Sequence, residues 1–240
     1  MPIDVRIDPE VSSAAAAGRS VQVSAVHLGG VPRGAVLIVA GPAGLGPVES
    51  VDVMNALAQH GYESVLATPT GLSPDGAVTG EIVQVLMDRL EARGWTPDQT
   101  GLIGYGRGAG VVVAAAAQTP YGAAVSIPRD AGELVGDARV TALRTPWLGI
   151  VGLGSDPDLD RRLREYRTDL ADASPEYTSV IGYPGVDHCL HDSTEASVHA
   201  AAFDAWQRTA EWLNTHVAFR PTPSAEAWNA RITATRPASA

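Results

Sequence analysis

A glycine-rich turn carries the strongest chemical signal in the sequence. The stretch reads Gly101-Leu-Ile-Gly-Tyr-Gly-Arg-Gly-Ala-Gly110, after an apolar run and before a helical pattern. A strand, a turn crowded with glycines and a helix form the setting of a nucleophile elbow, G-x-S-x-G, which serves acyl transfer. The frame is complete at Gly104, Gly106 and Gly108, but its central residue, Gly106, has no side chain to attack a carbonyl carbon.

Two further features of this turn bear on its chemistry. The backbone N–H of Arg107, which follows the central residue, would face the oxygen of a reacting carbonyl. Its side chain is either a cation for a carboxylate ligand or a solvated arginine at a helix start, and we favour the second. Glycine adopts the elbow conformation without strain, so we interpret Gly106 as a backbone feature rather than a catalytic group.

An acid and a histidine follow the elbow along the chain. Asp156 precedes Pro157 and an amphipathic pattern, and His188 lies in a Gly/Asp loop after an apolar run. The order elbow, Asp, His is that of hydrolases with a catalytic triad. In that scheme Asp156 would orient His188, which would act as general base, on water if no nucleophile is present. Alternatively, Asp156 is a helix N-cap and His188 a solvated loop residue.

Other reactive side chains near His188 favour simpler interpretations. Cys189 is the only cysteine, and we expect a packed thiol rather than a nucleophile. Asp187, His188, His191 and Asp192 form an HxxH-like cluster, but the spacing is generic and no partner cysteines accompany it. The sequence therefore predicts no metal site and no other cofactor.

A nucleotide site is the rival interpretation of the glycine-rich turn. Residues 104–109 fit G-x-G-x-x-A between a strand and a helix, and Asp130 lies about 20 residues further on, as a dinucleotide fingerprint requires. Such a fingerprint normally follows the first strand of its domain, whereas this one follows at least three predicted strands. We therefore keep nucleotide binding as a minor alternative.

The elements that must position these residues alternate between strand and helix. This alternation predicts right-handed βαβ crossovers, and hence an α/β fold with a doubly wound, mostly parallel sheet and helices on both faces. The predicted strands are Val21–Leu28, Ala35–Ala40, Ser64–Thr68, Gly101–Tyr105, Ala123–Ile127, Trp147–Val151 and Thr178–Tyr183. The predicted helices are Val48–His60, Glu81–Arg93, Arg107–Gln118, Asp158–Asp172 and Ser197–Val217.

These patterns divide the chain into three parts. We expect an N-terminal segment at 1–20, one domain at 21–217 and a Pro/Ala-rich tail at 218–240. The tail is either disordered or docks through Trp228 and Ile232, on the body or on a second subunit, which would allow a homo-oligomer.

Several segments together resemble the dienelactone hydrolase family of α/β-hydrolases. In that family the run equivalent to Arg89–Gly110 ends in G-Y-C-x-G-G, with cysteine as nucleophile. Ile150–Asp156 resembles the strand and loop of the catalytic aspartate, and Tyr183–His188 resembles the Y-x-G-x-x-H of the catalytic histidine. Leu37–Leu66 and Ala205–Leu213 resemble the first strands and the final helix. The resemblance implies hydrolysis of a small ester or lactone through an acyl-enzyme.

The chain departs from the family pattern at three places around one pocket. The nucleophile position is Gly106, and Gly41 or Pro42 stands where the family usually has a glutamate. Residues 68–71 read Thr-Pro-Thr-Gly where the family commonly has a Pro-Asp pair. We therefore expect a pseudoenzyme with weak or absent esterase activity that binds a small ester, lactone or related ligand, or a protein partner. The alternative is an active hydrolase that uses a water activated by His188.

Composition excludes several classes of partner. The chain has 240 residues, 27 acidic residues and 17 basic ones, all arginine, and a net charge of −10. Such an acidic surface repels phosphate backbones and anionic bilayers, so we expect neither nucleic acid nor membrane as partner. With one cysteine, no signal peptide and no apolar run long enough to cross a bilayer, the sequence predicts a cytoplasmic protein.

Overall fold

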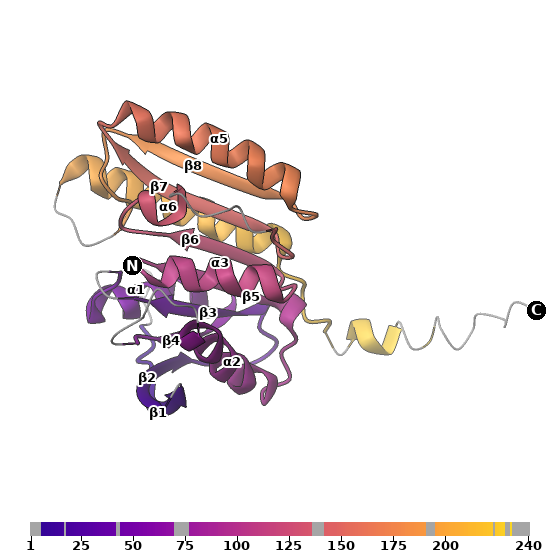
Figure 1. The fold of residues 1–240 in the computed structure, drawn as a ribbon. Coiled ribbons are helices and arrows are strands. Elements are labelled where there is room, and N and C mark those ends of the chain that lie inside the picture. Colours follow the sequence, from indigo (N-terminus) through magenta and orange to yellow (C-terminus); the bar gives the residue numbers. More distant parts are fainter. Residues whose placement is uncertain are drawn as a thin grey trace, which may run out of the picture.

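One eight-stranded sheet organises the protein, for which we describe a computed structural model (Figure 1). The structure describes residues 6–16, 18–41, 44–69, 77–135, 142–190, 195–222, 224–228 and 231. The strand order is β1-β2-β4-β3-β5-β6-β7-β8. The strands are β1 (Glu10–Ala16), β2 (Arg19–Val26), β3 (Gly34–Ala40), β4 (Tyr62–Ala67), β5 (Thr100–Tyr105), β6 (Ala123–Ile127), β7 (Trp147–Gly154) and β8 (Thr178–Pro184).

The sheet is parallel from β4 to β8 and antiparallel only where β1 and β2 join it. The parallel strands read as continuous apolar runs because helices cover both of their faces; in β3, for example, every residue is buried. The helices are α1 (Pro47–Gln59), α2 (Ala77–Glu91), η1 (Pro97–Gln99), α3 (Gly108–Gln118), α4 (Gly132–Val135), α5 (Pro157–Ala173) and α6 (Ala196–His216).

Two cores lie on opposite faces of the sheet. On one face α2, α3 and α5 contribute Ile82, Val112 and Leu163 to a buried cluster. On the other face α1 and α6 contribute Leu57 and Leu213 to a second cluster. The predicted doubly wound α/β fold is therefore confirmed, and it places the carboxyl ends of the parallel strands at one edge of the sheet.

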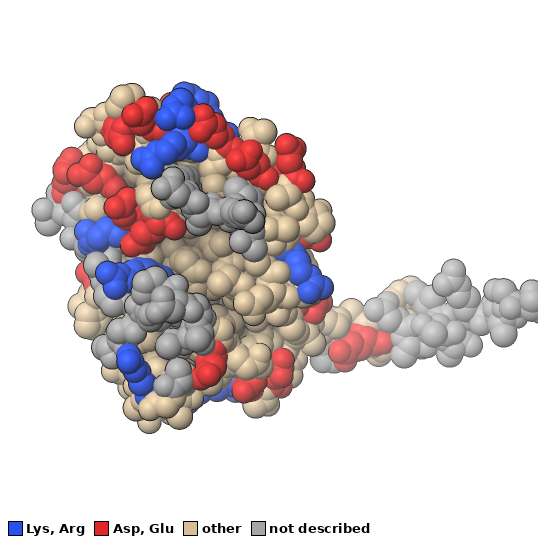
Figure 2. Space-filling view, in the orientation of Figure 1, with Lys and Arg blue, Asp and Glu red and all other residues tan. Residues whose placement is uncertain are grey.

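The helix α5 carries its charged residues on the face that points away from the core. Arg161 pairs with Glu165 at 2.9 Å and Arg164 with Asp160 at 2.6 Å, each four residues apart on the outer face of the helix. In Figure 2 the acidic and basic side chains intersperse along the top of the view, where α5 lies in Figure 1. The apolar stripe of α5 packs inward through Leu163 and Leu170.

Three elements were not predicted, and β1 is the largest of them. It lies within the predicted N-terminal segment 1–20, yet it pairs with β2 along its whole length. Its sequence, EVSSAAA, lacks the β-branched run that signals a strand, so its stability comes from pairing and not from propensity. The other two are the short helices η1 and α4.

The segment that follows α6 first packs on the rest of the protein through Phe219 and Arg220. The guanidinium of Arg220 lies 3.5 Å from the centre of the Trp95 ring, and that of Arg33 lies 3.9 Å from the centre of the Phe219 ring. Trp228 is 59% exposed, so it does not dock on the body, and Ile232 lies outside the described residues. No helix among the described residues combines the length and apolar character needed to cross a bilayer.

Candidate active site

The turn between β5 and α3 has the geometry of an elbow. Gly106 is buried and has a φ of +55°, in the region that L-residues adopt only with strain. Its N–H donates to the Ile127 carbonyl at 2.9 Å, and its carbonyl accepts from the Ala109 N–H at 3.0 Å. The backbone at position 106 is thus fixed between the neighbouring strand β6 and the first turn of α3.

The flanking glycines are required by close packing. A Cβ on Gly108 would lie 1.9 Å from the Val39 carbonyl oxygen, and one on Gly104 would lie 2.3 Å from the Gly108 carbonyl oxygen. Contacts this short are impossible, so no other residue fits at 104 or 108 without moving the helix. The glycine frame therefore brings the start of α3 against β3 and β5.

The loop after β3 lies against the same turn. The Gly41 N–H donates to the Tyr105 carbonyl at 3.1 Å, and a Cβ on Gly41 would lie 2.8 Å from Cβ of Arg107. The structure thus brings Gly41, Gly106 and Arg107 together, while Pro42 lies outside the described residues.

The Arg107 side chain faces outward and influences the acids after β6. It is exposed at the residue preceding α3. Burial and the neighbouring Asp130 charge raise the pKa of Glu133, and Arg107 opposes that rise. Asp130 itself accepts a hydrogen bond from the Gly132 N–H at 2.8 Å, which is a turn-capping role at the start of α4.

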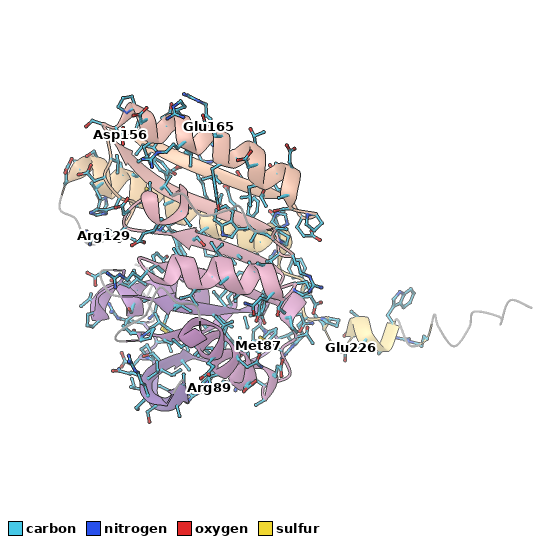
Figure 3. The ribbon with its side chains drawn as sticks, in the orientation of Figure 1. Met87, Arg89, Arg129, Asp156, Glu165 and Glu226 are labelled. Carbon is cyan, nitrogen blue, oxygen red and sulfur yellow. The ribbon has the colours of Figure 1, made fainter. Side chains whose placement is uncertain are left out.

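Asp156 follows β7 and caps α5, which is the alternative that the sequence left open beside a catalytic role. One carboxylate oxygen accepts from the Asp158 N–H at 2.9 Å, and the other lies 3.8 Å from Nη2 of Arg162. The side chain is 52% exposed. Within the described part of the chain the Asp156 carboxylate therefore contacts α5 and not His188. Figure 3 shows Asp156 at the start of α5.

His188 lies after β8, in a loop held tightly against the end of β7. The Gly154 N–H donates to the Val186 carbonyl at 2.9 Å, and the Gly185 N–H donates to the Gly154 carbonyl at 2.6 Å. A Cβ on Gly152 would lie 2.5 Å from the backbone nitrogen of His188. The two loops expected to carry an acid and a base are thus neighbours through their backbones.

The His188 ring is half-buried, and one of its nitrogens is engaged. The Leu190 N–H donates to Nδ1 at 3.3 Å, so Nδ1 is placed as an acceptor. A triad histidine has the opposite arrangement, with Nδ1–H donating to the acid. Cys189 next to it is 1% exposed, and burial followed by the Asp204 charge raises its pKa to about 12, which suits a packed thiol.

Sequence reasoning missed Asp204 and Arg208, two residues of α6 that connect this helix to Tyr183 on β8. The Tyr183 hydroxyl donates to Asp204, and Nε of Arg208 donates to the same carboxylate oxygen at 2.7 Å. These bonds hold the pKa of Asp204 below its usual value. The i,i+4 spacing of Asp204 and Arg208 was visible in the sequence, but nothing there indicated the tyrosine as their partner.

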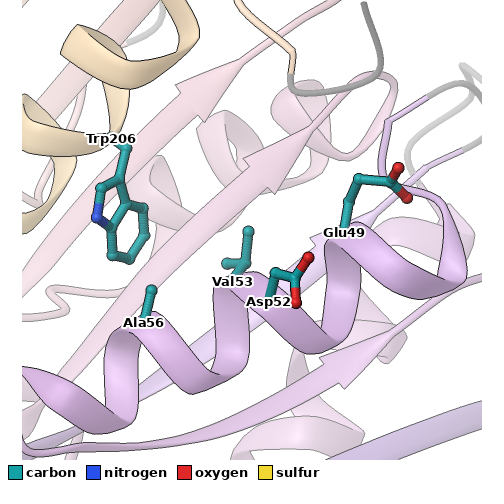
Figure 4. A pocket seen from close by; sticks show the side chains of 5 residues that line it. All are labelled: Glu49, Asp52, Val53, Ala56 and Trp206. Carbon is teal, nitrogen blue, oxygen red and sulfur yellow. The ribbon is translucent and has the colours of Figure 1, made fainter. Parts of the chain in front are cut away.

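A separate cavity of about 320 Å³ lies between α1 and α6 (Figure 4). Its lining combines two carboxylates with an aromatic ring. Asp52 lies 3.1 Å from the Arg6 guanidinium, so one of these carboxylates already has a cationic partner from the N-terminal segment. The lining residues are Glu49, Asp52, Val53, Ala56 and Trp206.

The described residues contain no group of three or more potential metal ligands. His191 and Asp192, two members of the HxxH-like cluster, lie outside those residues, as do Thr70 and Gly71. The expectation of no metal site and no other cofactor therefore stays a prediction.

Comparison with protein-family models identifies a family for this chain. The model of the dienelactone hydrolase family matches residues 75–217. No curated protein matches the chain.

Solved structures share the fold at low sequence identity. A Klebsiella pneumoniae protein assigned as a dienelactone hydrolase is 19% identical with a TM-score of 0.66, over 86% of this chain and 98% of that one. Esterase 2 of Thermogutta terrifontis is 12% identical with a TM-score of 0.66, over 91% and 98%. A puromycin-hydrolysing peptidase of Mycobacterium tuberculosis is 16% identical with a TM-score of 0.64, over 92% of this chain and 42% of that one.

Proposed function

Because the chain belongs to the dienelactone hydrolase family, we propose that it is a member that keeps the fold but has lost the acyl-enzyme chemistry. It binds a small ester, lactone or related ligand at the carboxyl edge of the sheet, above Gly106. The observation that carries this proposal is the glycine at the apex of the elbow. An acyl-enzyme needs a side-chain nucleophile at that point, and Gly106 has none.

Two further observations support a binding role over hydrolysis. The Asp156 carboxylate serves the N-terminus of α5, and Nδ1 of His188 accepts a hydrogen bond from Leu190. A general base on water needs an unprotonated nitrogen directed at that water and an acid to orient the ring. In the described geometry the Asp156 carboxylate is engaged with α5, and Nδ1 of His188 already accepts a hydrogen bond.

The retained frame supports a site that still accepts a carbonyl group. Gly104 and Gly108 keep the start of α3 against the sheet, so the backbone N–H of Arg107 keeps its place at the elbow. The exposed Arg107 side chain begins at the same turn and acts on Glu133, and its charge would favour a ligand that carries a carboxylate. Ligand binding would then rest on backbone donors and one charge.

The test is hydrolysis of a panel of small activated esters and lactones. We expect the unmodified protein to show no turnover above its His188→Ala variant, and Gly106→Cys or Gly106→Ser to gain measurable turnover. Gly106→Ala is the matched control, because it introduces the same backbone strain at positive φ without a nucleophile. It should stay inactive.

Two results would overturn parts of this proposal. Turnover by the unmodified protein that disappears in His188→Ala would establish the second candidate, a hydrolase that uses a water activated by His188. Failure of both nucleophile variants, with folding intact, would mean that the triad positions do not form a catalytic pocket. Binding is followed separately as the rise in melting temperature with non-hydrolysable carboxylates, which Arg107→Gln should reduce.

A further inference from the structure

The outer edge of β8 is an open end of the sheet. Among the described residues no strand pairs with it, and β7 pairs with its inner edge. The Trp147 N–H donates to the Tyr177 carbonyl at 3.1 Å, which fixes the direction of the alternating backbone groups. The N–H and C=O groups of Thr178, Val180 and Gly182 therefore point away from the sheet.

This edge lacks the devices that normally prevent strands from pairing. Edge strands are commonly protected by charges, by proline or by a covering segment. Residues 178–183 read Thr-Ser-Val-Ile-Gly-Tyr, with no charged residue and no proline, and the one proline of β8, Pro184, is its last residue. At the other end of the sheet, β1 begins with Glu10, and Nη2 of Arg89 donates to the Ser13 carbonyl at 3.0 Å. The contrast singles out β8.

An open trough follows the same edge on the α6 side of the sheet. It has a volume of about 300 Å³ and lies between β8 and α6. The helix packs on β6 and β7, so the side chains of Ser179 and Ile181 stay only half-buried. Tyr177, 66% exposed, stacks on Trp212 with 5.6 Å between ring centres, and Trp212 in turn contacts His216 at 4.4 Å.

We propose that a second copy of this chain occupies this edge, by antiparallel pairing of β8 with its counterpart across a two-fold axis. With the axis at Val180, Thr178 of one copy lies opposite Gly182 of the other. All three outward-pointing residues of each strand then find partners, in about six backbone hydrogen bonds. The two sheets become one continuous sheet, and the two troughs face each other on the same side of it.

The charges of the trough are self-complementary under this symmetry. Arg208 and Glu211 both line it, three residues apart on α6. Antiparallel packing of α6 on its counterpart brings Arg208 of each copy toward Glu211 of the other. A partner of different sequence would need to supply this opposite pattern, whereas a second copy supplies it by symmetry.

The test is the oligomeric state of the full chain by sedimentation velocity, from about 1 to 100 µM. We expect a species of twice the 24.9 kDa chain mass at high concentration. Ile181→Lys places a charge opposite Ser179 of the other copy and sets the two lysines diagonally across the two-fold axis on the trough side, so it should weaken the dimer at least tenfold. Val11→Lys is the matched control, because Val11 is 64% exposed on β1 and takes the same charge at the other edge. It should leave the dimer unchanged.

A second variant and a second measurement address the backbone directly. Thr178→Pro removes an outward N–H without breaking a bond to β7, so it should also weaken the dimer, with far-ultraviolet circular dichroism unchanged. Hydrogen exchange in the peptide covering 178–183 should slow as protein concentration rises. A monomer at every concentration would overturn the proposal. So would a dimer that survives both β8 variants but is lost when the chain ends at Thr222, which would assign assembly to the tail.

Discussion

At the scale of single residues, Asp156 has two candidate roles that one substitution separates. Serine caps helices about as well as aspartate but has no carboxylate. Alanine has no carboxylate and cannot cap a helix. We expect Asp156→Ser to keep the free energy of unfolding within about 0.5 kcal/mol and Asp156→Ala to lose about 1 kcal/mol. Urea denaturation measures both. An equal loss in the two variants would mean that the carboxylate stabilises the protein through its charge and not as a cap.

The same pair of variants tests the acid of the triad. If Gly106→Cys gains esterase activity, adding Asp156→Ser to it should leave that activity unchanged, because the Asp156 carboxylate contacts α5 in the described structure. A tenfold or greater loss of kcat in the double variant, without a change in stability, would show that Asp156 orients His188 during turnover.

Glu63 is the residue through which acid should destabilise this protein. Its side chain is 2% exposed and accepts hydrogen bonds from Arg93, from the Trp95 indole and from the Leu28 N–H. Burial alone would raise the pKa of Glu63, but these bonds outweigh it and hold the pKa below its ordinary value. The stabilisation is therefore full above the unfolded-state pKa of about 4.3, and is lost as pH falls through the lower folded-state pKa.

We expect Glu63→Gln to cost roughly 2 kcal/mol at pH 7 and progressively less as pH falls below about 4. Unfolding by urea at pH 7 and pH 3.5 measures this. Glu165→Gln is the matched control, because Glu165 is 59% exposed in its pair with Arg161, and such pairs contribute at most ~1 kcal/mol. A cost for Glu63→Gln that does not change with pH would contradict the depressed pKa.

At the scale of elements, the contact between α3 and the sheet makes a sharp prediction for two glycines. A Cβ on Gly108 would lie 1.9 Å from the Val39 carbonyl oxygen, whereas one on Gly110 would meet nothing within 4 Å. Gly108→Ala should therefore destabilise the protein by roughly 3 kcal/mol or more. Gly110→Ala, in the same helix, should stabilise it by about 0.5–1 kcal/mol.

Thermal unfolding of the two variants checks this directly. Equal and small effects would show that α3 can move away from β3 at little cost. In that case the glycine frame would not be a steric requirement, and the packing of α3 would no longer support a retained elbow.

Sequence patterns predicted some elements well because their signals are local. The apolar run of β3 and the Asp156-Pro157 start of α5 each contain the signal within a few residues, and the structure confirms both. The strand β1 and the bond from Tyr183 to Asp204 depend on partners far along the chain. Nothing in EVSSAAA or in an isolated tyrosine indicates such partners.

The candidate site shows the same difference between features with a local signal and features that depend on distant partners. The elbow at Gly106 is a local pattern and was predicted with its strand, its helix and its glycine frame. The proximity of the loops after β7 and β8 depends on Gly152 and Gly154, whose backbones approach residues 186–188 only once the two strands are paired. The hydrogen bond from Leu190 to His188 could not be anticipated from spacing, because a loop has no fixed periodicity.

At the scale of the whole molecule, the described residues of the N-terminal segment are bonded to the rest of the fold. Nδ2 of Asn55 donates to the Ile7 carbonyl at 3.0 Å and Oδ1 of Asn55 accepts from the Ile7 N–H at 2.7 Å, which fastens the segment to α1. Further along, β1 completes the antiparallel end of the sheet. Ala14 and Ala16 of β1 lie over α2, near Ile82 and Leu86.

Deleting residues 2–17 should therefore lower the free energy of unfolding by roughly 2 kcal/mol or more, because apolar area on α2 becomes exposed. The deletion also leaves the edge of β2 unpaired, so aggregation should increase with concentration. Ending the chain at Thr222 is the control, since it keeps the contacts of Phe219 and Arg220 with the body and removes the exposed Trp228. Urea denaturation and light scattering measure both, and a deletion as stable as the full chain would establish residues 1–20 as a separable segment.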